Sequence, residues 1–145
     1  MLRSSNSLAG VHLDILLIDD SKYIRTFVRI HLQEAGYDVG EVEPESLFEV
    51  LEALHTHRPA LVITDYEMPL CHGESLLRAI REDPGLRNTP IIMLSAHGEA
   101  ELVARLSRWD LAAYVLKPIR PEELVEKVAR VFVSKIPVGE PGADD

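Results

Sequence analysis

The sequence predicts an α/β domain in which a parallel β-sheet is covered by helices on both faces. Four short runs are nearly continuous in isoleucine, leucine and valine, which is typical of parallel strands buried on both faces. Stretches with helical periodicity fill the gaps, so strand and helix alternate along the chain. Charged or polar residues end several of the apolar runs, and in a parallel sheet such ends meet at one edge.

The buried strands are expected at residues 13–18, 60–64, 90–94 and 113–116. A weaker candidate covers residues 37–42, where Val39 and Val42 are the apolar members. Gly36 precedes this segment and is typical of the end of a helix. Counting the weaker candidate, the unit of strand followed by helix occurs five times.

Helices are expected between and after these strands. The first is capped by Ser21 and runs to about Ala35. It carries two stripes of side chains at helical spacing, which are Tyr23, Phe27, Ile30 and Glu34, and Ile24, Val28 and Leu32. The second helix opens at Pro44 and the last at Pro121, because proline is favoured in the first turn. The third and fourth cover about residues 74–82 and 99–109.

Composition indicates one globular domain that acts away from membranes and nucleic acids. The 145 residues carry a net charge of −9, whereas a nucleic-acid-binding face would be basic. Cys71 is the only cysteine, which excludes an internal disulfide and fits a reducing, cytoplasmic location. No apolar run approaches the roughly 20 residues of a membrane span, and residues 1–10 lack the apolar core of a signal peptide.

The domain boundaries are predicted from composition at the two ends. Residues 1–11 are expected to be a disordered lead-in, residues 12–135 the folded domain, and residues 136–145 a disordered acidic tail rich in proline and glycine.

Acidic residues dominate the predicted functional edge. Asp19 and Asp20 end the first apolar run, Asp65 ends another, Ser95 follows a third and Lys117 ends a fourth. Clustered carboxylates repel one another and stay ionised only beside a cation. The pattern therefore indicates a site for a divalent metal and for phosphoryl chemistry.

The residues around these ends resemble those of response-regulator receiver domains of two-component signalling. The matching segments are Ile-Leu-Leu-Ile-Asp-Asp-Ser at residues 15–21, Thr-Asp-Tyr-Glu-Met-Pro at 64–69 with Gly73 beyond it, Leu-Ser-Ala at 94–96 and Tyr-Val-Leu-Lys-Pro at 114–118. The resemblance spans about residues 13–134. It implies a flavodoxin-like, doubly wound sheet of five parallel strands in the order 2-1-3-4-5 with five helices.

The resemblance implies that Asp65 is the phosphoacceptor, and a carboxylate is able to attack phosphorus and form an acyl phosphate. It also implies a Mg²⁺ site formed by Asp19, Asp20, Asp65 and the backbone carbonyl of Glu67, with Asp19 acting mainly through water. Hard oxygen ligands suit this ion, which usually keeps several waters.

Further roles are implied by the same resemblance. Ser95 and Lys117 would bind oxygens of the phosphoryl group, and the Lys117–Pro118 peptide would be cis. Ser95 and Tyr114 would form the conformational switch. Glu67 and His97 would flank the phosphoryl group as a lid and tune its hydrolysis.

Two residues before the last strand also carry expectations. Asp110 stands where many receiver domains have glycine, and aspartate tolerates a left-handed backbone better than most residues. Trp109 is expected to pack on the core rather than to contact a partner.

The leading interpretation is a stand-alone receiver that is not an enzyme beyond assisting its own phosphorylation and dephosphorylation. A sensor histidine kinase or a histidine phosphotransfer protein would donate the phosphoryl group. A downstream target protein would bind the surface formed by the fourth helix, the last strand and the fifth helix. The chain would act as a monomer or as a phosphorylation-dependent dimer.

Three alternatives remain open from the residues. A receiver-like module that interacts without phosphorylation would not need the complete set of polar residues at the strand ends. A Mg²⁺-dependent phosphohydrolase usually has two acids spaced by two positions after the first strand, but Asp19 and Asp20 are adjacent. A nucleotide or flavin binder would need a glycine-rich phosphate loop, and the first turn here is Asp-Asp-Ser-Lys.

Overall fold

The computed structural model describes residues 12–135 and contains one parallel sheet of five strands in the order β2-β1-β3-β4-β5. The strands are β1 (Ile15–Ile18), β2 (Val39–Val42), β3 (Leu61–Asp65), β4 (Ile91–Ser95) and β5 (Ala113–Leu116). The predicted fold class and strand order are therefore confirmed. The predicted lead-in at residues 1–11 and acidic tail at 136–145 lie outside the described residues.

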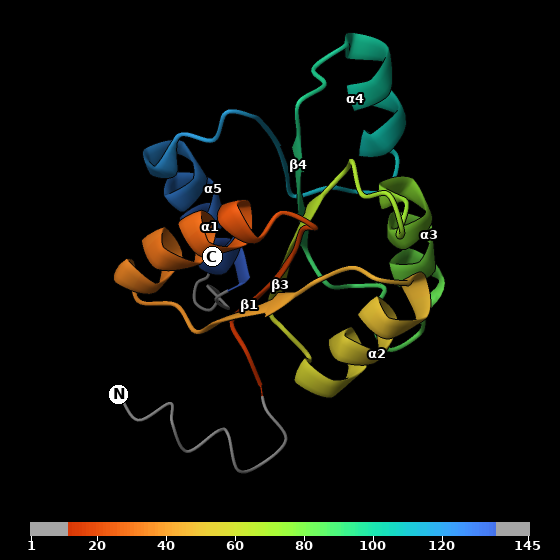
Figure 1. The fold of residues 1–145 in the computed structure, drawn as a ribbon, viewed down its shortest axis with the longest axis horizontal. Helices are drawn as coiled ribbons and strands as arrows, with labels where there is room; N and C mark the ends of the chain where they lie inside the picture. Colours follow the sequence, from red (N-terminus) through yellow and green to blue (C-terminus); the bar gives the residue numbers. More distant parts are fainter. Residues whose placement is uncertain (1–11, 136–145) are drawn as a thin grey trace, which may run out of the picture.

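Five helices in the described part cover the two faces of the sheet (Figure 1). They are α1 (Lys22–Glu34), α2 (Leu47–His57), α3 (Gly73–Glu82), α4 (Ala100–Ser107) and α5 (Pro121–Lys135). One apolar cluster joins a face of the sheet to α1 and α5 through Val28, Leu32 and Leu124. A second cluster joins the opposite face to α2, α3 and α4 and includes Leu54 and Leu106. Successive strand residues alternate between the two clusters, as the pleat requires.

The register of the sheet brings the chemically active residues to one edge. The strands end at nearly the same level, because the last residue of one strand pairs with the last or next-to-last residue of its neighbour; the pairs are Ile18 with Thr64, Asp65 with Leu94, and Ser95 with Leu116. Asp19 and Lys117 follow β1 and β5 directly, so both reach this same carboxyl edge.

Several predicted element ends were wrong, and local capping explains the largest error. The second helix begins at Leu47 and not at Pro44, because the hydroxyl of Ser46 accepts a hydrogen bond from the Glu49 N–H at 3.1 Å and caps the helix. The first strand begins at Ile15 rather than at residue 13, and the fourth helix is shorter than expected.

The buried face of α1 follows the second predicted stripe, since Val28 and Leu32 are buried and Ile24 packs against the same cluster. It also includes Arg25, which was not predicted, whereas Tyr23 of the first stripe is 74% exposed. The cap at Ser21 is confirmed, since its hydroxyl accepts from the Ile24 N–H at 3.2 Å.

The special backbone positions are as expected. Gly36 has φ of 103° and Asp110 has φ of 62°, both in the left-handed region, and the Lys117–Pro118 peptide is cis. Trp109 packs partly buried against the second apolar cluster, and its indole N–H donates to a Glu74 carboxylate oxygen at 3.2 Å.

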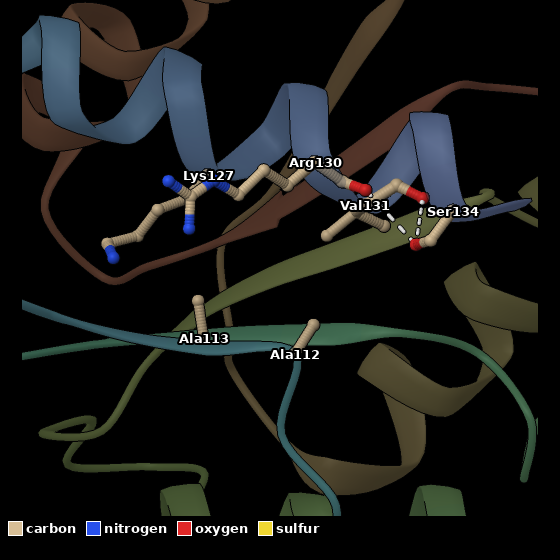
Figure 2. Close-up of a pocket in the computed structure, with 6 residues that line it drawn as sticks. All are labelled: Ala112, Ala113, Lys127, Arg130, Val131 and Ser134. Atoms are coloured by element: carbon tan, nitrogen blue, oxygen red, sulfur yellow. Dashed lines mark hydrogen bonds between the residues drawn. The ribbon is translucent and has the colours of Figure 1, made fainter.

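No helix within residues 12–135 combines the length and the apolar character needed to cross a membrane. A shallow pocket between α5 and the start of β5 is lined partly by Ala112, Ala113 and Lys127 (Figure 2). It lies at the amino end of β5, away from the carboxyl edge.

Arg81 near the end of α3 joins two loops that follow it in the chain. Its guanidinium donates to four backbone carbonyl oxygens, which are those of Trp109 at 2.7 Å, Arg87 at 3.0 Å, Thr89 at 2.8 Å and Asp110 at 3.1 Å. The left-handed turn at Asp110 is thereby tied to α3.

Arg81→Ala is expected to lower the free energy of unfolding by about 2–3 kcal/mol, because four carbonyls lose a charged donor and water replaces it only in part. Urea denaturation measures the change. Arg78→Ala on the exposed face of the same helix is the control, with an expected effect within about 0.5 kcal/mol. Equal effects of the two substitutions would contradict the bridging role of Arg81.

Candidate functional site

Three carboxylates meet at the carboxyl edge of the sheet. Asp19 and Asp20 follow β1, Asp65 ends β3, and one oxygen from each lies within 4.8 Å of the others. Asp19 and Asp65 are 3% and 2% exposed, whereas Asp20 faces solvent. The cluster predicted from the sequence is therefore formed by residues distant in the chain.

Lys117 supplies the cation that faces these acids. Its ammonium group donates to Asp65 Oδ1 at 2.9 Å and lies 3.7 Å from Asp19 Oδ2. Burial alone would lower the pKa of Lys117, but the hydrogen bond to Asp65 and the surrounding negative charges raise it. Lys117 therefore remains charged, and one positive charge faces three acids.

Burial raises the pKa values of two of the three acids. Burial raises the pKa of Asp65 to about 6, with the Asp19 charge adding to the shift and the Lys117 bond opposing it. Burial also raises the pKa of Asp19, against a hydrogen bond from the Ser21 N–H at 2.8 Å. For both carboxyl groups, burial outweighs the hydrogen bonds and the cation that favour the ionised form.

The donor set fits Mg²⁺. Asp19 Oδ2 is buried without a hydrogen-bond partner, and such an orphaned oxygen is unusual in a native protein. An oxygen-only set with one exposed member suits a hard ion that keeps several waters. Asp19, Asp20 and Asp65 are the residues that would hold it, while the role of the Glu67 carbonyl stays a prediction.

Ser95, Glu67 and His97 form a connected group beside the acids. The buried Ser95 hydroxyl donates to Glu67 Oε2 at 3.2 Å and accepts from the His97 N–H at 2.9 Å. The His97 ring nitrogen Nε2 lies 3.0 Å from the same Glu67 oxygen. The contact between acid and histidine that a lid requires is thus present, and its effect on hydrolysis stays a prediction.

Tyr114 connects this group to the last strand. Its hydroxyl donates to the His97 backbone carbonyl at 2.6 Å. Since the His97 N–H is bonded to Ser95, the two predicted switch residues meet at opposite sides of one residue. A movement of Ser95 would therefore displace the His97 main chain and change the hydrogen bond that Tyr114 makes with it.

Two features of the site were missed or left unexplained by sequence reasoning. Arg25 is buried and donates to the main-chain oxygen of Asp19 at 2.6 Å. Its signal was its spacing of three and seven residues before Val28 and Leu32, which places a cation on the buried stripe. Gly73 was noted only as a motif residue; a Cβ there would lie 2.7 Å from the Tyr66 carbonyl oxygen.

Comparison with known proteins agrees with this geometry. The family model of the response regulator receiver domain matches residues 15–129. The chemotaxis protein CheY of Pseudomonas aeruginosa is 29% identical over 118 residues, which cover 81% of this chain and 94% of that protein.

Solved structures give the same result. The chemotaxis protein CheY4 of Vibrio cholerae is 30% identical with a TM-score of 0.75, covering 83% of this chain and 99% of that one. A putative response regulator from Chloroflexus aurantiacus is 27% identical with a TM-score of 0.76, covering 84% and 98%.

The raised pKa of Asp65 predicts a pH-dependent stability in the absence of Mg²⁺. Because this pKa is about 6 in the folded state against an ordinary 3.8, the folded state binds more protons between these values. The contribution of Asp65 to stability therefore falls as pH rises through that window. Asp65→Asn is expected to be more stable than wild type near pH 7.5 by about 1–3 kcal/mol, and of similar stability near pH 4.

Urea denaturation in EDTA at both pH values checks this expectation. Added Mg²⁺ should stabilise wild type more than Asp65→Asn, since binding to the folded state adds to its stability. A mutant no more stable than wild type near neutral pH would contradict the assigned shift.

Proposed function

The chain belongs to the response regulator receiver domain family, and we propose that it accepts a phosphoryl group on Asp65 in a Mg²⁺-dependent reaction. The observation that carries the proposal is the buried Asp65 carboxylate, which is bonded to Lys117 at 2.9 Å beside two further acids. Membership of this family favours a signalling domain over the phosphohydrolase and over the nucleotide or flavin binder.

The proposed chemistry is a transfer between two groups. A carboxylate oxygen of Asp65 attacks phosphorus, and the bond from phosphorus to the donor's histidine nitrogen breaks, leaving an acyl phosphate. Lys117 then pairs with a phosphoryl oxygen as a point charge. Asp19, Asp20 and Asp65 would hold Mg²⁺, which would offset carboxylate repulsion and the charge on the transferred group.

The signal would arise from competition for the Ser95 proton. In this structure the Ser95 hydroxyl donates to Glu67, and a phosphoryl oxygen on Asp65 would compete with that carboxylate. Moving Ser95 disturbs its bond with the His97 N–H and, through His97, the Tyr114 hydroxyl. A local change of charge would thereby alter the surface of α4, β5 and α5.

The partners follow from this role. The donor would be a sensor histidine kinase or a histidine phosphotransfer protein, and a downstream target protein would bind the altered surface. The chain would work in the cytoplasm as a monomer or phosphorylation-dependent dimer. Its net charge of −9 supports the absence of direct nucleic-acid binding. It would assist only its own phosphorylation and dephosphorylation.

Incubation with acetyl phosphate and Mg²⁺ is expected to add one phosphoryl group to wild type and none to Asp65→Asn, as measured by intact mass. EDTA should prevent the modification, because the crowded acids then lack their second cation. Beryllium fluoride with Mg²⁺ should shift the NMR signals of Ser95 and Tyr114 in wild type only. Identical behaviour of the two proteins would favour an interaction module that is never phosphorylated.

Glu67→Ala is expected to shorten the lifetime of the phosphorylated state by roughly 3- to 10-fold, which corresponds to about 1 kcal/mol in the barrier. The reason is that Glu67 and His97, which contact each other and Ser95, would form a lid over Asp65, and removal of one would admit water. Loss of radiolabelled phosphate measures the rate.

Glu99→Ala is the matched control for this experiment. Glu99 lies 3.6 Å from the other ring nitrogen of His97, so the substitution also removes an acid from His97 without exposing Asp65. An unchanged rate in Glu67→Ala, or an equal change in both variants, would rule out the lid.

A further inference from the structure

Arg25 lies beneath the acidic site in the first turns of α1 and is only 8% exposed. Its Nη1 donates to the main-chain oxygen of Asp19 at 2.6 Å, and its Nε donates to Glu41 Oε1 on β2 at 3.0 Å. The planar guanidinium holds both acceptors at once, which a single ammonium group would not do. Arg25 therefore connects the edge strand β2 to the turn that carries two of the acids.

Glu41 offsets part of the positive charge of Arg25. Glu41 pairs with Arg25 through one carboxylate oxygen and with Arg29 through the other. Burial would raise the pKa of Glu41, but these two arginines outweigh it and lower the pKa. Because Glu41 stays ionised and in contact, it reduces the net charge that Arg25 presents, and the hydrogen bond to the Asp19 main chain is the direct contact of Arg25 with the acidic turn.

The hydrogen bond from Arg25 to the Asp19 main-chain oxygen also constrains the backbone of Asp20. The peptide between Asp19 and Asp20 is planar, so the direction of the Asp19 oxygen sets the direction in which the Asp20 backbone leaves. Within residues 12–135, no hydrogen bond or ion pair is found for the exposed Asp20 side chain, whereas Asp19 is also held by the Ser21 N–H. The position of Asp20 thus depends on the main chain that Arg25 holds.

We propose that Arg25 is a positioning residue for Mg²⁺, which holds the turn after β1 so that the carboxylates of Asp19 and Asp20 face Asp65. The proposal rests on the proposed function, in which these acids bind the ion. It assigns to Arg25 no contact with the ion or with the phosphoryl group. Residues that orient metal ligands through hydrogen bonds without touching the metal commonly change the metal affinity by about 10- to 100-fold when they are replaced.

The geometric and electrostatic roles predict opposite signs. If Arg25 acted mainly as a nearby positive charge, its removal would make the site more negative and would tighten Mg²⁺ binding. If it positions the acids, removal weakens binding. The direction of the change therefore separates the two roles.

The test is a Mg²⁺ titration of the full chain, followed by amide chemical shifts in NMR spectra. Arg25→Gln is expected to raise the Kd for Mg²⁺ about tenfold or more. The Mg²⁺ concentration that half-saturates phosphorylation by acetyl phosphate should rise similarly, while the rate at saturating Mg²⁺ changes less than about twofold, because the reacting groups remain in place. An unchanged or lower Kd would overturn the proposal.

Arg29→Gln is the matched control, because Arg29 binds the same Glu41 without reaching Asp19. Its Kd should stay close to that of wild type, and an effect equal to that of Arg25→Gln would overturn the proposal. Arg25→Lys retains the buried charge and serves if Arg25→Gln lacks a cooperative thermal transition. It should still bind Mg²⁺ more weakly than wild type, and wild-type affinity in it would show that charge alone suffices.

Mg²⁺ binding by the wild-type protein distinguishes failure of the positioning role of Arg25 from failure of the proposed function. If wild type itself shows no Mg²⁺-dependent shifts around Asp65, the proposed function fails. If wild type binds Mg²⁺ and Asp20→Asn does not, while Arg25→Gln and Arg25→Lys both bind like wild type, only the positioning role fails.

Discussion

The crowding of three carboxylates around one lysine is the constraint on which the rest of the site depends. Asp65 is almost fully buried against Lys117, and Asp19 keeps an oxygen without a hydrogen-bond partner. Buried acids are costly unless compensated, and burial accordingly raises the pKa of both aspartates. The parallel sheet provides the rigid edge that keeps these charges together despite their repulsion. In the proposed function, an added cation or phosphoryl group would change the balance of charge at this edge.

A short series of hydrogen bonds connects the acidic site to Tyr114 on β5. Ser95 is bonded to Glu67 and to the His97 main chain, and the His97 carbonyl is bonded to Tyr114. The neighbouring α4 has one buried residue, Leu106, and lacks a side-chain hydrogen bond at its N-terminus. Few buried contacts are typical of elements that move at low cost. α4, which lies next to these hydrogen bonds, therefore has fewer buried residues to hold it than α1, α2 or α3.

The pattern of apolar residues along the sequence was sufficient to predict the order of most strands and helices. The strong apolar runs became strands, and the weak candidate became β2, since an edge strand needs fewer apolar residues. The predicted helices and strands differed from the structure mainly at their ends, where a single capping hydrogen bond can decide at which residue a helix begins. Ser46 and not Pro44 begins α2, because its hydroxyl caps the helix. The conformation at Asp110 was anticipated, but its tie to Arg81 was not, because that bond joins residues 29 positions apart.

The sequence by itself determined the strand and helix order, and it predicted the carboxyl edge of the sheet as the candidate site with the acids, serine and lysine that lie there. Periodicity and residue type carry this information because they act within a few neighbouring positions. Only the tertiary structure decided that Arg25 lies beneath Asp19, that Glu67 accepts the Ser95 proton, and that Tyr114 meets His97. These contacts depend on the register of the sheet and on the side-chain rotamers packed around it, which no local pattern specifies.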